Sequence, residues 1–269
     1  MSITAQDIWT AVLAIRKKSP VVHNITNYVA MNTTANALLA IGASPVMAHA
    51  AEEVEEMVGI ASALVINIGT LSREWVHSMF HAAEVARTKG IPIVLDPVGA
   101  GATSYRTKTA RELIKAVPPG IIRGNASEIM ALLGAGAKTK GVDSLASSEE
   151  ATTIGRELHA QCGAVVCISG STDYTIGDDG VVLTRNGDPM MTRVTGLGCT
   201  ASALCGAFAA VNAGLFLAAA QAMTVMGIAG EIASSRSQGP GSLQMHFLDA
   251  LYRLSADDIL RLLKIEVRA

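Results

Sequence analysis

The 269-residue chain is half hydrophobic, 16% of its residues are charged, and its formal net charge is −2. This composition allows a sizeable core in one large or two small domains, and without a basic block we expect no nucleic-acid partner. The four cysteines lack CxxC spacing and residues 1–7 lack the features of a signal peptide, so we expect free thiols and a cytoplasmic protein.

Apolar runs alternate with helical patterns along most of the chain. We expect strands at 21–24, 44–47, 63–67, 91–96, 120–123 and 164–169, a hairpin at 172–176 and 181–185, and a strand at 192–195. Helices are expected at 4–18, 30–41, 52–57, 72–88, 105–116, 124–133 and 147–161, with a glycine-rich loop at 134–141. Strands separated by helices indicate βαβ units, so we predict a single α/β domain over residues 1–269 with a mostly parallel, helix-covered sheet.

A long uncharged stretch runs from Val194 to Gly230. It is long enough to span a membrane, for which about 20 apolar residues suffice. However, hydroxyl and amide side chains interrupt it, and alanine dominates where leucine would be expected in lipid. Residues 212–214 indicate a break, so we expect two buried helices followed by a helical C-terminal region, and no membrane partner.

The segment around Gly196 and Gly198 is the centre of the functional prediction. We expect a strand, a glycine turn and a buried helix that begins near Cys199. The first N–H groups of a helix lack intrahelical acceptors and carry partial positive charge, so this turn suits a phosphate. Such a helix start should also lower the pKa of the Cys199 thiol.

Other interpretations of the same segment remain open. A glycine turn before a helix is common and is equally consistent with a tight turn that binds nothing. The run also fits a loose dinucleotide fingerprint, but no acidic residue follows Arg193 before Glu231, and that fingerprint needs one about 20 positions later.

Polar side chains follow several other predicted strands. Asn27, Asp96, Arg123, Glu128 and Ser169 all fall where strands end, and ligands of such sheets bind beyond the carboxyl ends. Each could instead cap a helix or form a turn. Because they share one edge of the sheet, we predict an anion-binding site there. The methionines at positions 31, 190, 191, 223 and 226 we expect in the core.

Seven short motifs, taken together, are specific. They are VHNITN at 22–27, GASPVM at 42–47, NIGT at 67–70, LDPVGAGA at 95–102, IRGN at 122–125 followed by Glu128, VTGLGC at 194–199 and GPGS at 239–242. Through them nearly the whole chain resembles the hydroxyethylthiazole kinases of the ribokinase-like superfamily. The resemblance implies a ribokinase-like sheet with helices on both faces. It also implies ATP- and Mg²⁺-dependent phosphorylation of 4-methyl-5-(2-hydroxyethyl)thiazole, a salvage step toward thiamine.

The resemblance also implies a homotrimer with active sites at subunit interfaces. Met47 and Gly196 would contact the thiazole, with Asn27 nearby, while Arg123 and Ser169 would contact ATP.

The remaining roles concern the phosphates and the reacting alcohol. Asp96 and Glu128 would lie near Mg²⁺ and the phosphates, and the Gly198 amide would bind the terminal phosphate of ATP. Cys199 would occupy the place where related sugar kinases have an aspartate base. Two rival functions remain: an ATP-dependent dehydratase of hydrated NAD(P)H, and a nucleotide- or thiazole-binding module without catalysis.

Overall fold

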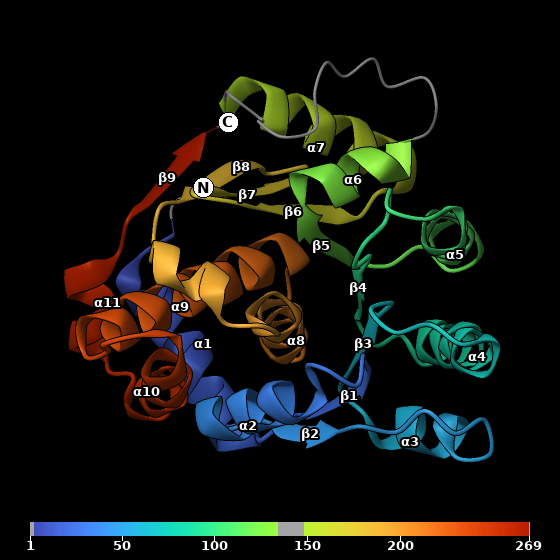
Figure 1. The fold of residues 1–269 in the computed structure, drawn as a ribbon, viewed down its shortest axis with the longest axis horizontal. Coiled ribbons are helices and arrows are strands. Elements are labelled where there is room, and N and C mark those ends of the chain that lie inside the picture. The colour runs from blue at the N-terminus through green and yellow to red at the C-terminus, as the bar shows by residue number, and fades with distance from the viewer. Residues whose placement is uncertain (1–2, 134–147, 269) are drawn as a thin grey trace.

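The computed structural model describes residues 3–133 and 148–268, so the expected loop at 134–141 lies outside the described residues. Within them, nine strands form one sheet: β1 Val21–Ile25, β2 Ser44–Val46, β3 Ala63–Asn67, β4 Ile93–Asp96, β5 Ile121–Asn125, β6 Val165–Ser169, β7 Asp173–Gly177, β8 Gly180–Thr184 and β9 Ile265–Arg268. Their order is β2-β1-β3-β4-β5-β6-β7-β8-β9 (Figure 1). The first six strands in that order are parallel and the last three join antiparallel. The predicted mostly parallel sheet is confirmed.

Helices cover both faces of this sheet, as expected (Figure 1). One core lies under α3 Val54–Ile60, α4 Arg73–Lys89, α5 Ser104–Ala116, α6 Ala126–Leu133 and α7 Ser148–Cys162. The other lies under α1 Ala5–Lys18, α2 Met31–Ile41, α8 Leu197–Ala209, α9 Leu215–Ser235, α10 Pro240–Arg253 and α11 Ala256–Leu262. The helix boundaries follow local signals: Thr4 caps α1 through a capping box, and the left-handed Gly42 ends α2.

Three local expectations are wrong. Residues 192–195 are not a strand, because a 3₁₀ helix η1 runs through Pro189–Arg193, started by Pro189 and capped by the Asp188 carboxylate. Helix α8 begins at Leu197, two residues before Cys199. The C-terminal region is not wholly helical, since β9 pairs with β8 at the sheet edge.

The uncharged stretch folds as the expected pair of helices, α8 and α9, separated near Asn212. Helix α9 is long and apolar enough to cross a membrane, yet 83% of its most apolar window is buried inside the molecule. Core helices of globular proteins satisfy the same length and composition test. Its apolar surface is therefore accounted for by packing against the sheet and α10.

Candidate active site

Parallel strands bring the predicted polar residues to one edge of the sheet. Asn67 and Asp96 are paired at the carboxyl ends of β3 and β4, and Asn125 and Ser169 are paired at the ends of β5 and β6. Helix α8 packs across these strands. The site is thus built where the ends of the central strands meet the start of a buried helix.

The start of α8 offers free backbone donors. Gly196 caps the helix in the left-handed region, at φ 84°, and its carbonyl accepts the first helical bond from the Thr200 amide at 2.9 Å. The amides of Leu197, Gly198 and Cys199 precede that bond, so they have no acceptor inside the helix. A Cβ on Gly198 would lie 2.9 Å from Arg123 Nη1, so only glycine lets the guanidinium lie this close to the helix start.

The Cys199 thiol lies beside these amides and is half-buried. Its Sγ accepts a hydrogen bond from Asn27 Nδ2 at 3.2 Å. Burial is the largest effect and raises the pKa of the Cys199 thiol above its usual value, and the nearby Asp96 carboxylate raises it further. The hydrogen bond from Asn27 acts in the opposite direction. The expected lowering of this pKa is therefore wrong, because desolvation and the neighbouring carboxylate outweigh the hydrogen bonds from Asn27 and Asn67 and the charge of Arg123.

A hydrogen-bonded chain links the thiol to a buried carboxylate. Asn27 Nδ2 also donates to Asn67 Oδ1 at 2.9 Å, and Asn67 Nδ2 donates to Asp96 Oδ2 at 2.7 Å. Ser202 Oγ donates to the same Asp96 oxygen at 2.7 Å. Burial raises the pKa of Asp96 to about 7, although Arg123, Ser202 and Asn67 favour its charged form.

Sequence reasoning missed Ser202. One signal for it existed: it lies one helical turn after Gly198, on a helix whose other buried residues are mostly small and apolar. A hydroxyl at that spacing points to the same side of the helix as Gly198.

Arg123 and Ser169 meet on the neighbouring strands. Arg123 Nη2 donates to Ser169 Oγ at 2.8 Å, while its Nε is buried with no partner. Burial disfavours the charge, but Asp96 and Asp173 raise the pKa of Arg123 overall. An always-charged guanidinium with a buried, unpartnered donor is suited to an anionic ligand.

Glu128 and Met47 lie around this cluster. Glu128 Oε1 accepts the Gly99 amide and Oε2 accepts the Asn125 amide, both at 2.8 Å, so its carboxylate joins the loops after β4 and β5. Met47 follows β2 at the edge of the sheet and is half-buried. It therefore lies at the periphery of the cluster, on the side of β1 and β2.

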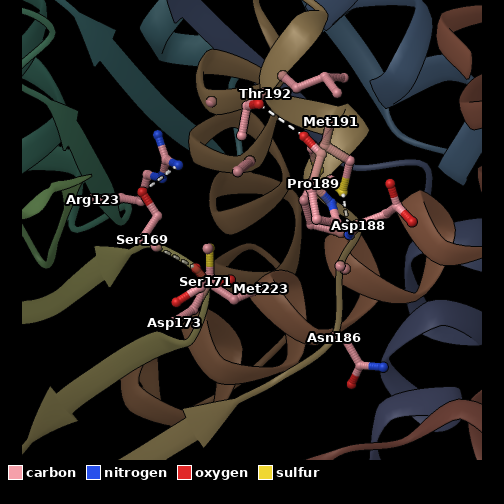
Figure 2. Close-up of a pocket in the computed structure, with 17 residues that line it drawn as sticks. Arg123, Ser169, Ser171, Asp173, Asn186, Asp188, Pro189, Met191, Thr192 and Met223 are labelled. Atoms are coloured by element: carbon pink, nitrogen blue, oxygen red, sulfur yellow. Dashed lines mark hydrogen bonds between the residues drawn. The ribbon is translucent and has the colours of Figure 1, made fainter. Parts of the chain in front are cut away.

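A cavity of about 500 Å³ opens beside Arg123 (Figure 2). Arg123, Ser169 and Gly198 line it, together with Asp173. Burial raises the pKa of Asp173 to about 6, against the Gly170 amide and Arg123. Asp173 was not predicted from the sequence, because it opens a strand of the expected hairpin and does not lie at the end of a parallel strand.

Three methionines expected in the core belong to it and also line the cavity. Met223 and Met226, on α9, are buried in one core, and Met191, on η1, packs against that core. These elements are distant in sequence from β5 and β6, so no local pattern indicated that they share a cavity with Arg123. The other methionines do not line it: Met31 and Met190 pack, partly buried, against the two cores, as expected.

The nine-stranded sheet with helices on both faces is a ribokinase-like fold, and its site places unpaired helix amides and Arg123 beside a cavity of about 500 Å³. A solved pyridoxal kinase from Staphylococcus aureus shares the fold, with a TM-score of 0.60 and 16% identity over 79% of this chain and 87% of that one. The model of the hydroxyethylthiazole kinase family matches residues 12–257, so the chain belongs to that family.

Individual relatives agree. A hydroxyethylthiazole kinase from Syntrophus aciditrophicus is 65% identical over 98% of both chains. A solved hydroxyethylthiazole kinase from Pyrococcus horikoshii superposes with a TM-score of 0.92 and 42% identity over 98% of this chain and 100% of that one. The protein is thus a kinase that phosphorylates the hydroxyethyl group of the thiazole precursor in thiamine salvage, with ATP as co-substrate. Among the three functions considered from the sequence, the kinase is the one that these matches support.

Proposed function

We propose that the γ-phosphoryl group of ATP is bound by the amides of Leu197, Gly198 and Cys199 and is transferred to the thiazole alcohol lying beside Cys199 Sγ. The observation that carries this proposal is the unpaired start of α8 beside Arg123, at the wall of the 500 Å³ cavity. Arg123, hydrogen-bonded to Ser169, neutralises phosphate charge. Fixed donors of this kind stabilise charge that develops in the transition state.

Magnesium belongs to the same proposal. Asp96 accepts both of its hydrogen bonds on Oδ2, so among the described residues Oδ1 has no protein donor. Mg²⁺ is usually held by one or two carboxylates plus phosphates and water, and Asp96 with Glu128 fits that donor set. When bound, the ion would neutralise phosphate charge; Asp96 and Glu128 hold it directly or through water.

Cys199 acts as the base in this proposal. The alcohol oxygen forms the new bond to the γ-phosphorus while the bond to the leaving ADP oxygen breaks, and the hydroxyl proton passes to Sγ. The transition state is loose, so the proton leaves late and a weak base suffices. Only the thiolate form of Cys199 can accept this proton, and because burial raises the pKa of the thiol, turnover is expected to rise with pH as that form becomes more populated.

The thiazole lies between Cys199 and the β1–β2 edge in our proposal, in contact with Gly196, Met47 and Asn27. Tyr28 and Val29 follow Asn27 and are 66% and 62% exposed. Large apolar side chains exposed next to a site suit a subunit contact. These two residues support a subunit contact beside the site. From the family resemblance we propose a homotrimer with interfacial active sites, built from a single kinase domain of residues 1–269 and located in the cytoplasm.

A coupled assay of ADP formation tests the proposal. With ATP, Mg²⁺ and hydroxyethylthiazole we expect turnover and a phosphorylated thiazole detected by mass spectrometry. Turnover with hydrated NADH instead would support the dehydratase. ATP binding without ADP formation would support the binding module, and either result contradicts the proposed function.

A further inference from the structure

The cavity has two chemically different sides. Arg123 and Ser169 lie on one side, and Met191 and Pro189 lie on the opposite side (Figure 2). Met223 and Met226, which also line the cavity, are only 2% and 5% exposed and lie one turn apart on α9. We call Met191, Met223 and Met226 the methionine wall. A phosphate chain bound at Arg123 places the rest of a nucleotide toward this wall.

Asn186 lies near the methionine wall, but both N–H groups of its amide are used inside the protein. Asn186 Nδ2 donates to Glu231 Oε1 at 3.0 Å and to the Leu262 carbonyl at 2.7 Å, while Oδ1 accepts the Lys264 amide at 3.0 Å. In Figure 2 its side chain points away from the space between Arg123 and Thr192. The Asn186 amide therefore has no N–H left to donate to a ligand.

The backbone beside Asn186 is engaged in the same way. The Gly187 amide donates to Glu231 Oε1 at 3.0 Å. The Met190 amide donates to Asp188 Oδ1 at 2.8 Å, and the Met191 amide donates to the Asp188 carbonyl at 3.0 Å. These donors hold η1 together and are not directed into the cavity.

Thr192 and Asp188 also line the cavity on the side of η1. Thr192 Oγ1 donates to the Pro189 carbonyl at 2.8 Å, and in Figure 2 the Asp188 carboxylate points outward. The donors described here on η1 and the segment before it are thus satisfied within the protein. Donors free to bind a ligand lie instead at the start of α8 and on Arg123, where phosphates would bind.

We infer that the kinase holds the base of its donor nucleotide by packing against the methionine wall, and that Asn186 and η1 do not identify the base by donating hydrogen bonds to it. It therefore takes purine nucleoside triphosphates in general, not ATP alone. This inference rests on the proposed function, in which the nucleotide occupies this cavity. Sites that hydrogen-bond a polar group reject analogues lacking it by about 10⁴–10⁵, whereas apolar pockets discriminate by about 10–200-fold. Methionine side chains are polarisable and adapt to differing shapes.

Steady-state kinetics with the wild-type enzyme and hydroxyethylthiazole test the inference. The donors compared are ATP, GTP and purine riboside triphosphate, which keeps the purine shape but lacks the amino group of adenine. We expect the three kcat/KM values to agree within about 200-fold. A deficit larger than about 200-fold for purine riboside triphosphate or GTP overturns the inference. If ATP itself gives no phosphorylated thiazole, the proposed function fails instead, so the two failures are distinguishable.

A substitution in the methionine wall tests whether the base packs there. Met223→Ala should raise KM for ATP and GTP by the same factor, about tenfold, with little change in kcat, because packing on both bases is lost equally. Met223→Leu, which keeps the volume, and Met245→Ala, exposed on α10, are the controls and should keep KM near the wild-type value. Calorimetric ATP binding checks each variant independently of turnover. Unchanged KM values in Met223→Ala, or a change for one purine alone, contradict the inference.

Discussion

Asn27 contacts two residues that lie 40 and 172 positions away in the sequence, Asn67 and Cys199. Its single Nδ2 group donates to both, and its Oδ1 accepts the Ala30 amide at 2.9 Å, so the orientation of its amide is fixed. The sequence indicated Asn27, Asp96 and Cys199 because they follow strands or a glycine turn. It could not indicate that they form one chain through Asn67, since that depends on strand order.

Asp173 gives a prediction at the scale of one residue. Its pKa is raised to about 6 in the folded protein, above an ordinary value of 3.8. The native state therefore binds more protons than the unfolded state between about pH 4 and 6, and stability contributed by the neutral carboxyl is lost as the pH rises through that window. Asp173→Asn stays neutral, so its melting temperature relative to wild type should rise between pH 4 and 7.

Between pH 4 and pH 7, the free energy of unfolding of the variant relative to wild type should rise by about 1–3 kcal/mol. Thermal unfolding without nucleotide, followed at pH 4, 5, 6 and 7, measures it. At pH 4 the wild-type carboxyl is mostly protonated, so the melting temperature of the variant relative to wild type should be at its lowest there. Parallel curves over the whole range would show that Asp173 is not perturbed in the folded protein.

At the scale of an element, α8 determines the site more than any single strand. The sequence indicated a glycine turn followed by a buried helix, because Gly196 and Gly198 precede a run of small apolar residues. The sequence-based prediction placed the start of α8 two residues too late, and it predicted a strand at 192–195 where η1 ends. A short 3₁₀ helix has no hydrophobic periodicity of its own, and its start depends on the capping contact of Asp188. The paired ends of β3 to β6 were predictable because buried parallel strands are continuous apolar runs.

The start of α8 can be tested with a matched pair of glycines. Gly198→Ala places a methyl group 2.9 Å from Arg123 Nη1, which forces the guanidinium away from the phosphate position. Overpacking of this kind costs about 1–3 kcal/mol, so KM for ATP should rise by about tenfold or more. Calorimetric titration with ATP measures the loss of affinity directly.

Gly241→Ala is the control, because Gly241 also lies at the second position of a helix, α10, and an added Cβ there meets nothing within 4 Å. It should bind ATP as the wild type does. Equal affinities in the two variants would show that Gly198 does not set the approach of Arg123 to the helix.

At the scale of the whole molecule, the sheet and its two helical layers were predictable from the alternation of strands and helices. The methionine wall of the cavity was not, because it joins η1 and α9 to strands that precede them by many residues. The exposed apolar residues next to the site were not indicated either, since exposure depends on the complete fold. Tyr28 and Val29 belong to that group.

Assembly can be tested at Val29. Val29→Glu puts a charge on the surface proposed as the subunit contact, so mass photometry should show trimers for the wild type and monomers for the variant. Turnover of the thiazole should fall while ATP binding persists, because the thiazole site is completed by the neighbouring subunit in this proposal. Leu260→Glu, 72% exposed on α11, is the control and should leave the trimer intact. A trimeric Val29→Glu variant would contradict the assigned interface.

The most direct measurement is the turnover of Cys199 variants beside their affinity for ATP. Cys199→Ala keeps the helix amides but removes the proton acceptor, so kcat should fall by about 10²–10⁴ while the Kd for ATP remains near the wild-type value. Cys199→Asp supplies another base at the same position and should retain or raise turnover. A Cys199→Ala enzyme that works at the wild-type rate, or a folded but inactive Cys199→Asp enzyme, would contradict the role of the thiol.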